Sequence, residues 1–320
     1  MAYDNLPGGS HLTGTLTLPL GKGPFPAILL ITGSGLQDRD ETIFGHKPFL
    51  VWADYLTRRG IAVLRVDDRQ TGGSTGEVRT ATSADFAGDV QTGTAFLRLR
   101  SDIDRRRIGL LGHSEGAIIA PIVAARDSTI GFIVMLEGSG EPGETLMLQQ
   151  KRLVETAAGV APAIVDQSAK RMQRLYDAVK DAPDQAAAEI ALRTTWRSIA
   201  SENGQADDSP PAQLLAIASP WMRWFVRYDP RPTLAKVHCP VLAIGGSKDL
   251  QVPADANLSG IKAALQANSD TTVVNLPGIN HMLQNSETGQ LSEYGQIEET
   301  VAPVVLSTVG DWIVSHTSHT

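Results

Sequence analysis

Two short stretches near the start of the chain have the hydrophobic patterns of β-strands. Residues 12–18 read L-T-G-T-L-T-L, and this alternation of apolar and polar positions predicts a half-exposed edge strand. Residues 24–32 read P-F-P-A-I-L-L-I-T, an apolar run that stops at Gly33-Ser34-Gly35. Such a run, closed by turn residues, predicts a buried strand whose end opens into a loop.

Helical and strand patterns then alternate as far as residue 136. Apolar residues at helical spacing predict three helices, over residues 49–59, 83–100 and 117–125. Short apolar runs between them predict three strands, over residues 61–66, 107–111 and 131–136. An alternation of this kind is typical of an α/β fold with a mostly parallel sheet and helices on both faces.

The alternation stops near residue 137, where a helical insertion begins. Residues 143–235 are rich in Ala, Gln, Arg and Leu at helical spacing and hold no convincing strand pattern. Strand patterns resume at residues 240–244 and 271–275, and a last helix is predicted over residues 302–316. We therefore expect an α/β core domain of residues 1–142 and 236–320, with residues 143–235 inserted as a helical cap subdomain.

Composition and charge exclude several classes of protein. The 320 residues carry a net charge of −7 and no Lys/Arg cluster, which disfavours a nucleic-acid partner. Cys239 is the only cysteine, so an internal disulfide is excluded and a cysteine-based metal site is disfavoured. No apolar run approaches the ~20 residues of a membrane span, and no signal peptide is visible. The expectation is a globular protein without metal or cofactor, cytoplasmic as the chain stands or secreted if a leader has been removed.

The pattern G-x-S-x-G, which places a nucleophilic serine on a sharp turn, occurs twice, around Ser74 and around Ser114. Ser114 follows the buried run I-G-L-L and precedes the apolar helix A-I-I-A, as a strand–turn–helix requires. Ser74 is separated from its preceding strand by V-D-D-R-Q-T-G and is followed by no core helix. The flanks therefore predict Ser114 as the nucleophile and place Ser74 in a flexible surface loop.

A nucleophilic serine needs a histidine and an acid, which follow it in the order acid, then histidine, in this class of fold. His281 lies in a loop after the predicted strand at 271–275, and Asp249 follows the strand at 240–244. Loops at the carboxyl ends of parallel strands share one edge of the sheet. Ser114, Asp249 and His281 are therefore the predicted triad, with Glu137, after the strand at 131–136, as the competing acid.

Backbone N–H groups near the serine would stabilise an oxyanion. We expect the N–H groups of Ser34 and Glu115 in this role, with Gly35 as an alternative to Ser34. The charged run Q-D-R-D-E that follows is a solvated face, unless Gln37 and Arg39 brace the loop.

The chain resembles serine hydrolases of the α/β-hydrolase superfamily, and most closely a bacterial group of dienelactone-hydrolase-like or S9/S33-peptidase-like esterases. The likeness rests on T-G-S-G-L-Q-D-R-D-E (32–41), V-D-D-R-Q-T-G-G-S-T-G (66–76), G-H-S-E-G (112–116), G-S-K-D-L-Q-V-P (246–253), N-H-M-L-Q (280–284) and S-E-Y-G-Q-I-E-E-T (292–300). It implies the same triad and a helical cap over the site. In the second stretch Gln70 stands where this group often has glycine.

The predicted activity is hydrolysis of a small or medium acyl or aryl ester through an acyl-enzyme. Aromatic residues near the end of the insertion, Trp221, Trp224, Phe225 and Tyr228, would form an apolar substrate wall or simply the core of the cap. An aminopeptidase or amidase is the alternative, with Glu141, Glu144 or Glu155 binding a substrate ammonium group. A non-catalytic binding protein of the same fold is a further alternative. The oligomeric state is left open, a homodimer included.

Overall fold

The computed structural model describes residues 1–204 and 209–318. Eight strands form one sheet in the order β1-β2-β4-β3-β5-β6-β7-β8. The strands are β1 (Ala2–Asn5), β2 (Ser10–Thr17), β3 (Phe25–Ile31), β4 (Ala62–Val66), β5 (Ile103–His113), β6 (Phe132–Leu136), β7 (Val241–Gly246) and β8 (Thr271–Leu276). β1 and β2 pair antiparallel, β2 pairs antiparallel with β4, and the pairs from β4 to β8 are parallel. The predicted α/β class with a mostly parallel sheet is confirmed.

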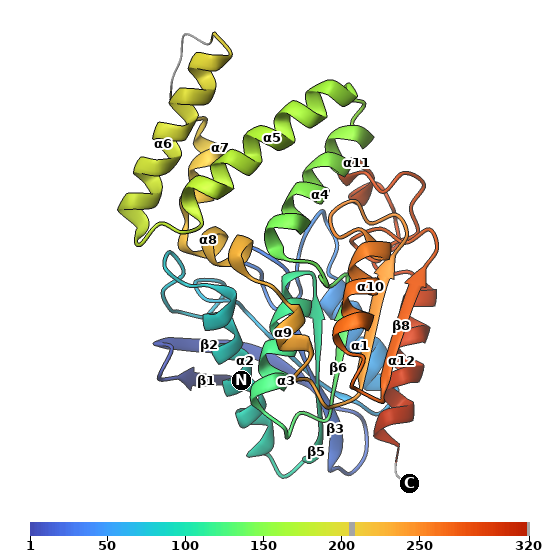
Figure 1. The fold of residues 1–320 in the computed structure, drawn as a ribbon. Coiled ribbons are helices and arrows are strands. Elements are labelled where there is room, and N and C mark those ends of the chain that lie inside the picture. The colour runs from blue at the N-terminus through green and yellow to red at the C-terminus, as the bar shows by residue number, and fades with distance from the viewer. Residues whose placement is uncertain (205–208, 319–320) are drawn as a thin grey trace.

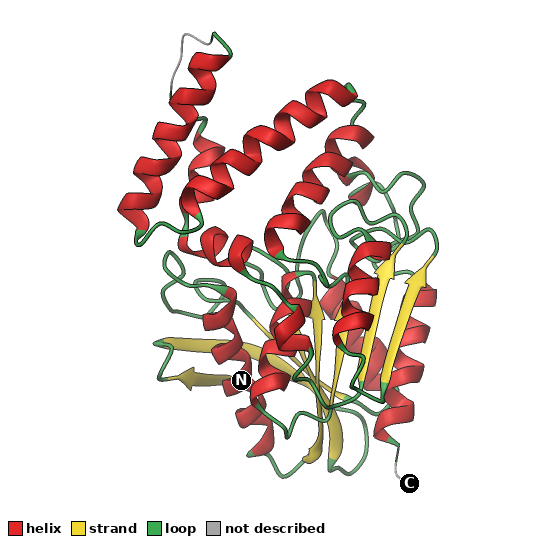
Figure 2. Cartoon of the chain, in the orientation of Figure 1, coloured by secondary structure: helices red, strands yellow, loops and turns green. Residues whose placement is uncertain are grey.

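Helices cover both faces of this sheet because the central strands are apolar on both sides. One face packs against α2 (Ser83–Arg98), α3 (Glu115–Arg126) and α10 (Ala254–Ala264). The other face packs against α1 (Pro48–Arg58) and α12 (Pro303–Thr317). Two large apolar clusters therefore pack against the sheet, one on each face. Figures 1 and 2 show the helices that cover these faces.

The insertion between β6 and β7 is helical, as its composition predicted. It contains α4 (Gly143–Ala157), α5 (Pro162–Val179), α6 (Gln185–Glu202), α7 (Ala212–Leu215), the short 3₁₀ turn η1 (Ala216–Ala218), α8 (Pro220–Arg227) and α9 (Arg231–Leu234). α5, α6, η1 and α8 share an apolar cluster that includes Trp196. Figure 1 shows α4 to α8 above the edge of the sheet toward which β7 and β8 point. The insertion therefore covers the edge at which the predicted site residues were expected.

Loops at this edge connect the remaining elements. The loop after β3 leads to α1, and the loop after β8 carries His281 and the short α11 (Leu291–Tyr294). The short strand β1 was not predicted, because its four residues, A-Y-D-N, show no run of alternating apolar positions. Its pairing with β2 provides it with hydrogen bonds that the local pattern did not indicate.

Candidate active site

Ser114 occupies a strained turn between the last residue of β5 and the first residue of α3. Its φ is 53° and its ψ is −114°, in a region that residues with a side chain rarely adopt. A Cβ on Gly112 would overlap the backbone of Gly116, and a Cβ on Gly116 would overlap the backbone of Ile31. The two glycines thus allow strand and helix to approach closely, and the strand–turn–helix expected from G-x-S-x-G is present.

A chain of hydrogen bonds joins Ser114 to His281 and Asp249. The distance from Ser114 Oγ to His281 Nε2 is 3.1 Å, and that from His281 Nδ1 to Asp249 Oδ2 is 2.7 Å. The other carboxylate oxygen, Asp249 Oδ1, accepts from the backbone N–H groups of Gln251 at 2.7 Å and Val252 at 2.9 Å. The segments that follow β5, β7 and β8 therefore bring Ser114 together with two side chains that lie more than a hundred positions later in the sequence.

Glu137 places a second buried carboxyl group against Asp249. It follows β6 and accepts a hydrogen bond from the N–H of Gly246 at 3.0 Å. Burial, followed by the charge of Asp249 and the hydrogen bond to it, raises the pKa of Glu137 well above its ordinary value. Burial also opposes ionisation of Asp249, but the charge and hydrogen bond of His281, with the hydrogen bond from Glu137, lower its pKa. The pKa values of the two groups are therefore shifted in opposite directions, which favours a proton on Glu137 and the charge on Asp249.

His113 links the turn at Ser114 to two neighbouring loops. Its Nδ1 lies 3.0 Å from Glu41 Oε1, and its Nε2 lies 2.8 Å from the backbone carbonyl of His281. Burial would lower the pKa of His113, but the charge and hydrogen bond of Glu41, with the carbonyl of His281, raise it above its ordinary value. Glu41 Oε1 also accepts from the N–H of Gly33 at 2.6 Å. A buried ion pair thus ties the loop after β3 and the loop after β8 to the end of β5.

The loop after β3, residues 33–36, presents exposed backbone beside the start of α3. Ser34 and Gly35 are exposed, and Gly35 has a φ of 110°, which favours glycine. Asp68 holds both ends of this loop. It accepts from Thr32 Oγ1 at 2.9 Å and from the N–H of Gln37 at 3.0 Å. The predicted donors Ser34 and Gly35 therefore lie in a loop that Asp68 holds at both ends, while Glu115 is the first residue of α3.

A second acid of the segment after β4, Asp67, also holds the chain that follows the 33–36 loop in place. The Arg39 guanidinium pairs with Asp67 through Nη2–Oδ2 at 2.5 Å and Nε–Oδ1 at 3.0 Å. Gln37 and Arg39 therefore both brace the loop, and the reading of this run as a plain solvated face is wrong. Gln70, at the position where relatives often have glycine, has a φ of 63°. The backbone thus keeps the left-handed conformation that glycine would favour.

The stretch around Ser74 is a mostly exposed loop after β4, as predicted, but Ser74 itself is buried in it and is held by hydrogen bonds. The residue is only 4 % exposed. Ser74 Oγ donates to the carbonyl of Asp67 at 2.8 Å and accepts from the N–H of Thr13 at 2.9 Å. The Ser74 hydroxyl thus links the segment after β4 to β2 through hydrogen bonds. The local sequence pattern could not indicate this contact, because Thr13 is far from Ser74 in the sequence.

Glu115, directly after Ser114, joins the core to the helical insertion. Its Oε1 accepts from Ser83 Oγ at 2.6 Å and from Trp221 Nε1, on α8, at 2.7 Å. Burial raises the pKa of Glu115, and the hydrogen bonds from Ser83, Trp221 and Ser34 only partly offset this effect. The carboxyl group therefore connects α2, α8 and the 33–36 loop at the start of α3.

A pocket between Ser114 and the insertion, here called the Ser114 pocket, has a volume of about 200 Å³. It is lined by Ser34, Ser114, Glu115, Ile118, Glu137, Ser139, Leu146, Met147, Gln150, Trp221, Phe225, Gln251 and Val252. Of the four predicted aromatic wall residues, Trp221 and Phe225 line it and stack on each other with ring centroids 5.2 Å apart. Trp224 and Tyr228 instead stack on each other at 4.5 Å and pack against the core.

Of the three acids predicted to bind a substrate ammonium group, two are paired with lysines and the third does not line the Ser114 pocket. Glu144 pairs with Lys180 at 3.0 Å, and Glu155 pairs with Lys151 at 2.6 Å. Glu141 lies in the loop between β6 and α4 and is not among the lining residues of the Ser114 pocket in the part of the chain that the structure describes.

Sequence reasoning missed the supporting groups His113, Glu41, Asp68 and Ser83. His113 and Glu41 lie within stretches that carried the family resemblance, and this was their only signal. Asp68 is one of several acids in V-D-D-R, and Ser83 had no signal, because its partner Glu115 is 32 positions away.

Neither a membrane span nor a metal cluster is found within residues 1–204 and 209–318. None of the helices there is long and apolar enough to cross a membrane. In the same residues, no group of three or more His, Cys, Asp or Glu side chains is arranged to hold a metal ion.

The sheet order, the strand–turn–helix and the hydrogen-bonded Ser–His–Asp chain define the α/β-hydrolase class. A family model described as "X-Pro dipeptidyl-peptidase (S15 family)" matches residues 8–274, and the chain belongs to this family.

Two curated relatives match part of this chain in sequence. It is 34% identical over 145 residues to Esterase EstD from Thermotoga maritima, covering 45% of this chain and 34% of that protein. It is 28% identical over 123 residues to Esterase FrsA from Escherichia fergusonii, covering 38% of this chain and 27% of that protein. The chain thus spans about a third or less of the length of these relatives.

Solved structures match over nearly the whole chain. Est1E from Butyrivibrio proteoclasticus, bound to ferulic acid, superposes with a TM-score of 0.59 at 17% identity, covering 99% of this chain and 98% of that one. The α/β hydrolase GrgF from Penicillium sp. sh18 gives a TM-score of 0.60 at 15% identity, covering 100% and 98%. At such identities these matches establish the fold.

Proposed function

We propose that this chain is a serine carboxylic-ester hydrolase in which Ser114 is the nucleophile, His281 the general base and Asp249 the orienting acid. The observation that carries the proposal is the hydrogen-bonded chain of these three side chains at a strained strand–turn–helix. The esterase names of the curated relatives support the same reaction type.

In the proposed reaction, Ser114 Oγ attacks the ester carbonyl while His281 Nε2 takes its proton. Asp249 accepts from His281 Nδ1–H, which fixes the tautomer and stabilises the imidazolium. The N–H groups of Ser34 and Glu115 donate to the developing oxyanion, each donor contributing ~2.7–4 kcal/mol of transition-state stabilisation. His281 then protonates the leaving alcohol and activates a water molecule against the acyl-enzyme.

A second candidate is peptidase activity, because the matching family model is named for X-Pro dipeptidyl-peptidases. An enzyme of that kind must bind a substrate ammonium group. The cap acids Glu144 and Glu155 are already paired with lysines. Two acids line the Ser114 pocket: Glu115 has a raised pKa and accepts hydrogen bonds from Ser83 and Trp221, and the pKa of Glu137 is raised well above its ordinary value. A substrate cation would find few free carboxylates here, so we favour the ester.

Labelling with a fluorophosphonate tests the nucleophile. We expect stoichiometric labelling of the wild type, loss of labelling in Ser114→Ala and retention in Ser74→Ala, with circular dichroism to verify folding. Labelling that survives Ser114→Ala would contradict the proposal. Hydrolysis of p-nitrophenyl esters without cleavage of X-Pro p-nitroanilides would separate the ester reading from the peptidase reading.

A further inference from the structure

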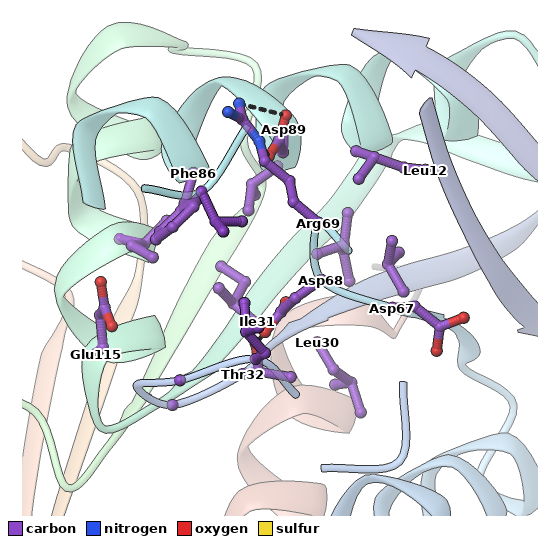
Figure 3. Close-up of a pocket in the computed structure, with 18 of the residues that line it drawn as sticks. Leu12, Leu30, Ile31, Thr32, Asp67, Asp68, Arg69, Phe86, Asp89 and Glu115 are labelled. Atoms are coloured by element: carbon purple, nitrogen blue, oxygen red, sulfur yellow. Dashed lines mark hydrogen bonds and ion pairs between the residues drawn. The ribbon is translucent and has the colours of Figure 1, made fainter. Parts of the chain in front are cut away.

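The Ser114 pocket is the cavity from which a bound ester can reach the nucleophile. Ser114, Ser34 and Glu115 all line it, between the start of α3 and the helical insertion. A neighbouring cavity of about 70 Å³, shown in Figure 3, shares Glu115 with it. Within residues 1–204 and 209–318, Ser114 does not line this second cavity. The lining of the Ser114 pocket would therefore recognise the part of the substrate that adjoins the reacting carbonyl group.

The Ser114 pocket combines apolar walls with two amide side chains. Its apolar lining comprises Ile118, Leu146, Met147, Trp221, Phe225 and Val252. The amides belong to Gln150, on α4 of the insertion, and to Gln251, in the segment between β7 and α10. Both residues are half-buried, so a substrate that fills the pocket would cover them further. Because a covered amide without a hydrogen-bond partner costs free energy, the substrate must replace the water that these groups lose.

The two amides contact each other, but their hydrogen-bonding capacity is only partly used. Gln150 Nε2 donates to Gln251 Oε1 at 3.3 Å, and Gln251 Nε2 donates to Tyr294 Oη at 3.4 Å. Both distances exceed the roughly 2.9–3.0 Å that is most common for N–H···O hydrogen bonds. Gln150 Oε1 accepts no hydrogen bond from the residues that the structure describes. A ligand hydroxyl group, which both donates and accepts, can therefore bind Gln150 Oε1 and an N–H group of either amide.

The charges of the Ser114 pocket disfavour an ionic substrate group. Of the described residues, no Lys, Arg or His lines it. Its two acids, Glu115 and Glu137, have pKa values that burial raises. The hydroxyl group of Ser139 already has partners, since its Oγ lies 2.8 Å from the Glu141 carbonyl oxygen and 2.9 Å from Asn257 Oδ1. An uncharged polar group therefore suits this pocket better than an ion, and the two amides are its available partners.

We propose that Gln150 and Gln251 are specificity-determining residues that select an uncharged ester carrying a hydroxyl group. This inference rests on the proposed function. A cavity of ~150 Å³ holds a benzene ring, so the Ser114 pocket, with about 200 Å³, accommodates a ring or short chain with a hydroxyl substituent. An analogue without the hydroxyl group would leave the amides without a partner, and sites that hydrogen-bond a substrate hydroxyl discriminate in this way.

Two pairs of esters, in which a hydroxyl group replaces a methyl group, test this inference. The first pair is 3-methylphenyl and 3-hydroxyphenyl acetate; the second is ethyl butanoate and ethyl 3-hydroxypropanoate. We expect the wild type to have the higher kcat/KM for the hydroxylated member of at least one pair. Gln150→Leu and Gln251→Leu should lower that ratio about threefold to tenfold, the effect of losing one neutral hydrogen bond. The change should arise mainly from the hydroxylated ester.

Gln149→Leu is the matched control. Gln149 precedes Gln150 on α4 but is not among the lining residues of the Ser114 pocket in the described ranges. This variant should keep the wild-type ratio, and Ser114-dependent hydrolysis of the methylated esters verifies that each variant is folded.

Three results would overturn the inference. The wild type would favour the methylated member of both pairs, Gln150→Leu and Gln251→Leu would both keep the wild-type ratios, or Gln149→Leu would lower them equally. In each case Ser114-dependent hydrolysis of the methylated esters would leave the proposed function standing. If the wild type hydrolyses none of the four esters through Ser114, the proposed function itself fails, and the inference fails with it.

Discussion

At the scale of single residues, two neighbouring carboxyl groups, Glu137 and Asp249, have pKa values that are shifted in opposite directions. Both are buried, and two neighbouring like charges would oppose each other in a medium of low dielectric constant. His281 stabilises the charge on Asp249, so a proton held by the pair is favoured on Glu137. Glu137, which the sequence offered as the competing acid, is thus placed to donate a hydrogen bond to the acid that contacts His281.

Substitution of Glu137 tests this arrangement. Glu137→Gln keeps a donor toward Asp249, so kcat and the acidic limb of the pH profile of kcat/KM should stay close to those of the wild type. Glu137→Leu removes the donor and should lower kcat about tenfold with little change in KM, since hydrogen bonds to charged groups contribute ~1.5–3 kcal/mol. If Glu137 were ionised instead, Glu137→Gln would remove a negative charge near His281 and shift the acidic limb to lower pH.

At the scale of elements, one hydrogen bond links the insertion to the helix that follows the nucleophile. Trp221 on α8 donates to Glu115 on α3, and the same carboxyl accepts from Ser83 at the start of α2. Sequence periodicity predicted that α2, α3 and a helical insertion exist. It could not indicate that they meet at one carboxyl group, because that contact joins positions 106 residues apart.

Trp221→Phe should weaken the attachment of α8 to the core. The buried Glu115 loses a donor, so the free energy of unfolding should fall by ~1–3 kcal/mol in urea titrations. KM for an aryl ester should rise as well, because Trp221 lines the Ser114 pocket. Trp224→Phe is the control: its ring keeps an aromatic partner in Tyr228, and a smaller loss of stability with unchanged KM is expected. Equal effects of the two variants would show that the link to Glu115 is unimportant.

At the scale of the whole molecule, Asp68 makes the stability of the chain depend on pH in an unusual direction. Burial raises its pKa from the ordinary 3.8 to about 8 in the folded protein. Between these two values the folded protein binds a proton that the unfolded chain releases, so stability decreases as pH rises. Asp249 acts in the opposite sense, since its pKa is lowered and its contribution is lost as pH falls.

Asp68→Asn removes the titrating group while retaining an oxygen that accepts from Thr32 or Gln37. Urea unfolding from about pH 5 to about pH 9 should show a smaller loss of stability with rising pH than in the wild type. Asp54→Asn, at an exposed carboxyl paired with Arg58 on α1, should retain the wild-type trend over that range. A variant Asp68→Asn that follows the wild-type curve in parallel would mean that Asp68 is already ionised in the folded protein.

The sequence predicted strands and helices well where the hydrophobic pattern of the element's own residues determines its structure. β3, β4, β6, β7 and β8 appear within a few residues of their predicted positions, since each is a short apolar run closed by turn residues. The likeness to α/β hydrolases is confirmed by the family model and by the fold. The boundaries of the cap and the roles of Ser114, His281 and Asp249 stay proposals.

The sequence by itself determined the α/β class, the helical insertion and which of two G-x-S-x-G stretches forms a strand–turn–helix, because these depend on neighbouring residues. Only the tertiary structure decided the raised pKa of Glu137, the links made by His113 and Glu115, and the burial of Ser74. Each of these depends on how far water is excluded and on which distant loop supplies a partner. The order of strands in the sheet sets both, and no local pattern encodes it.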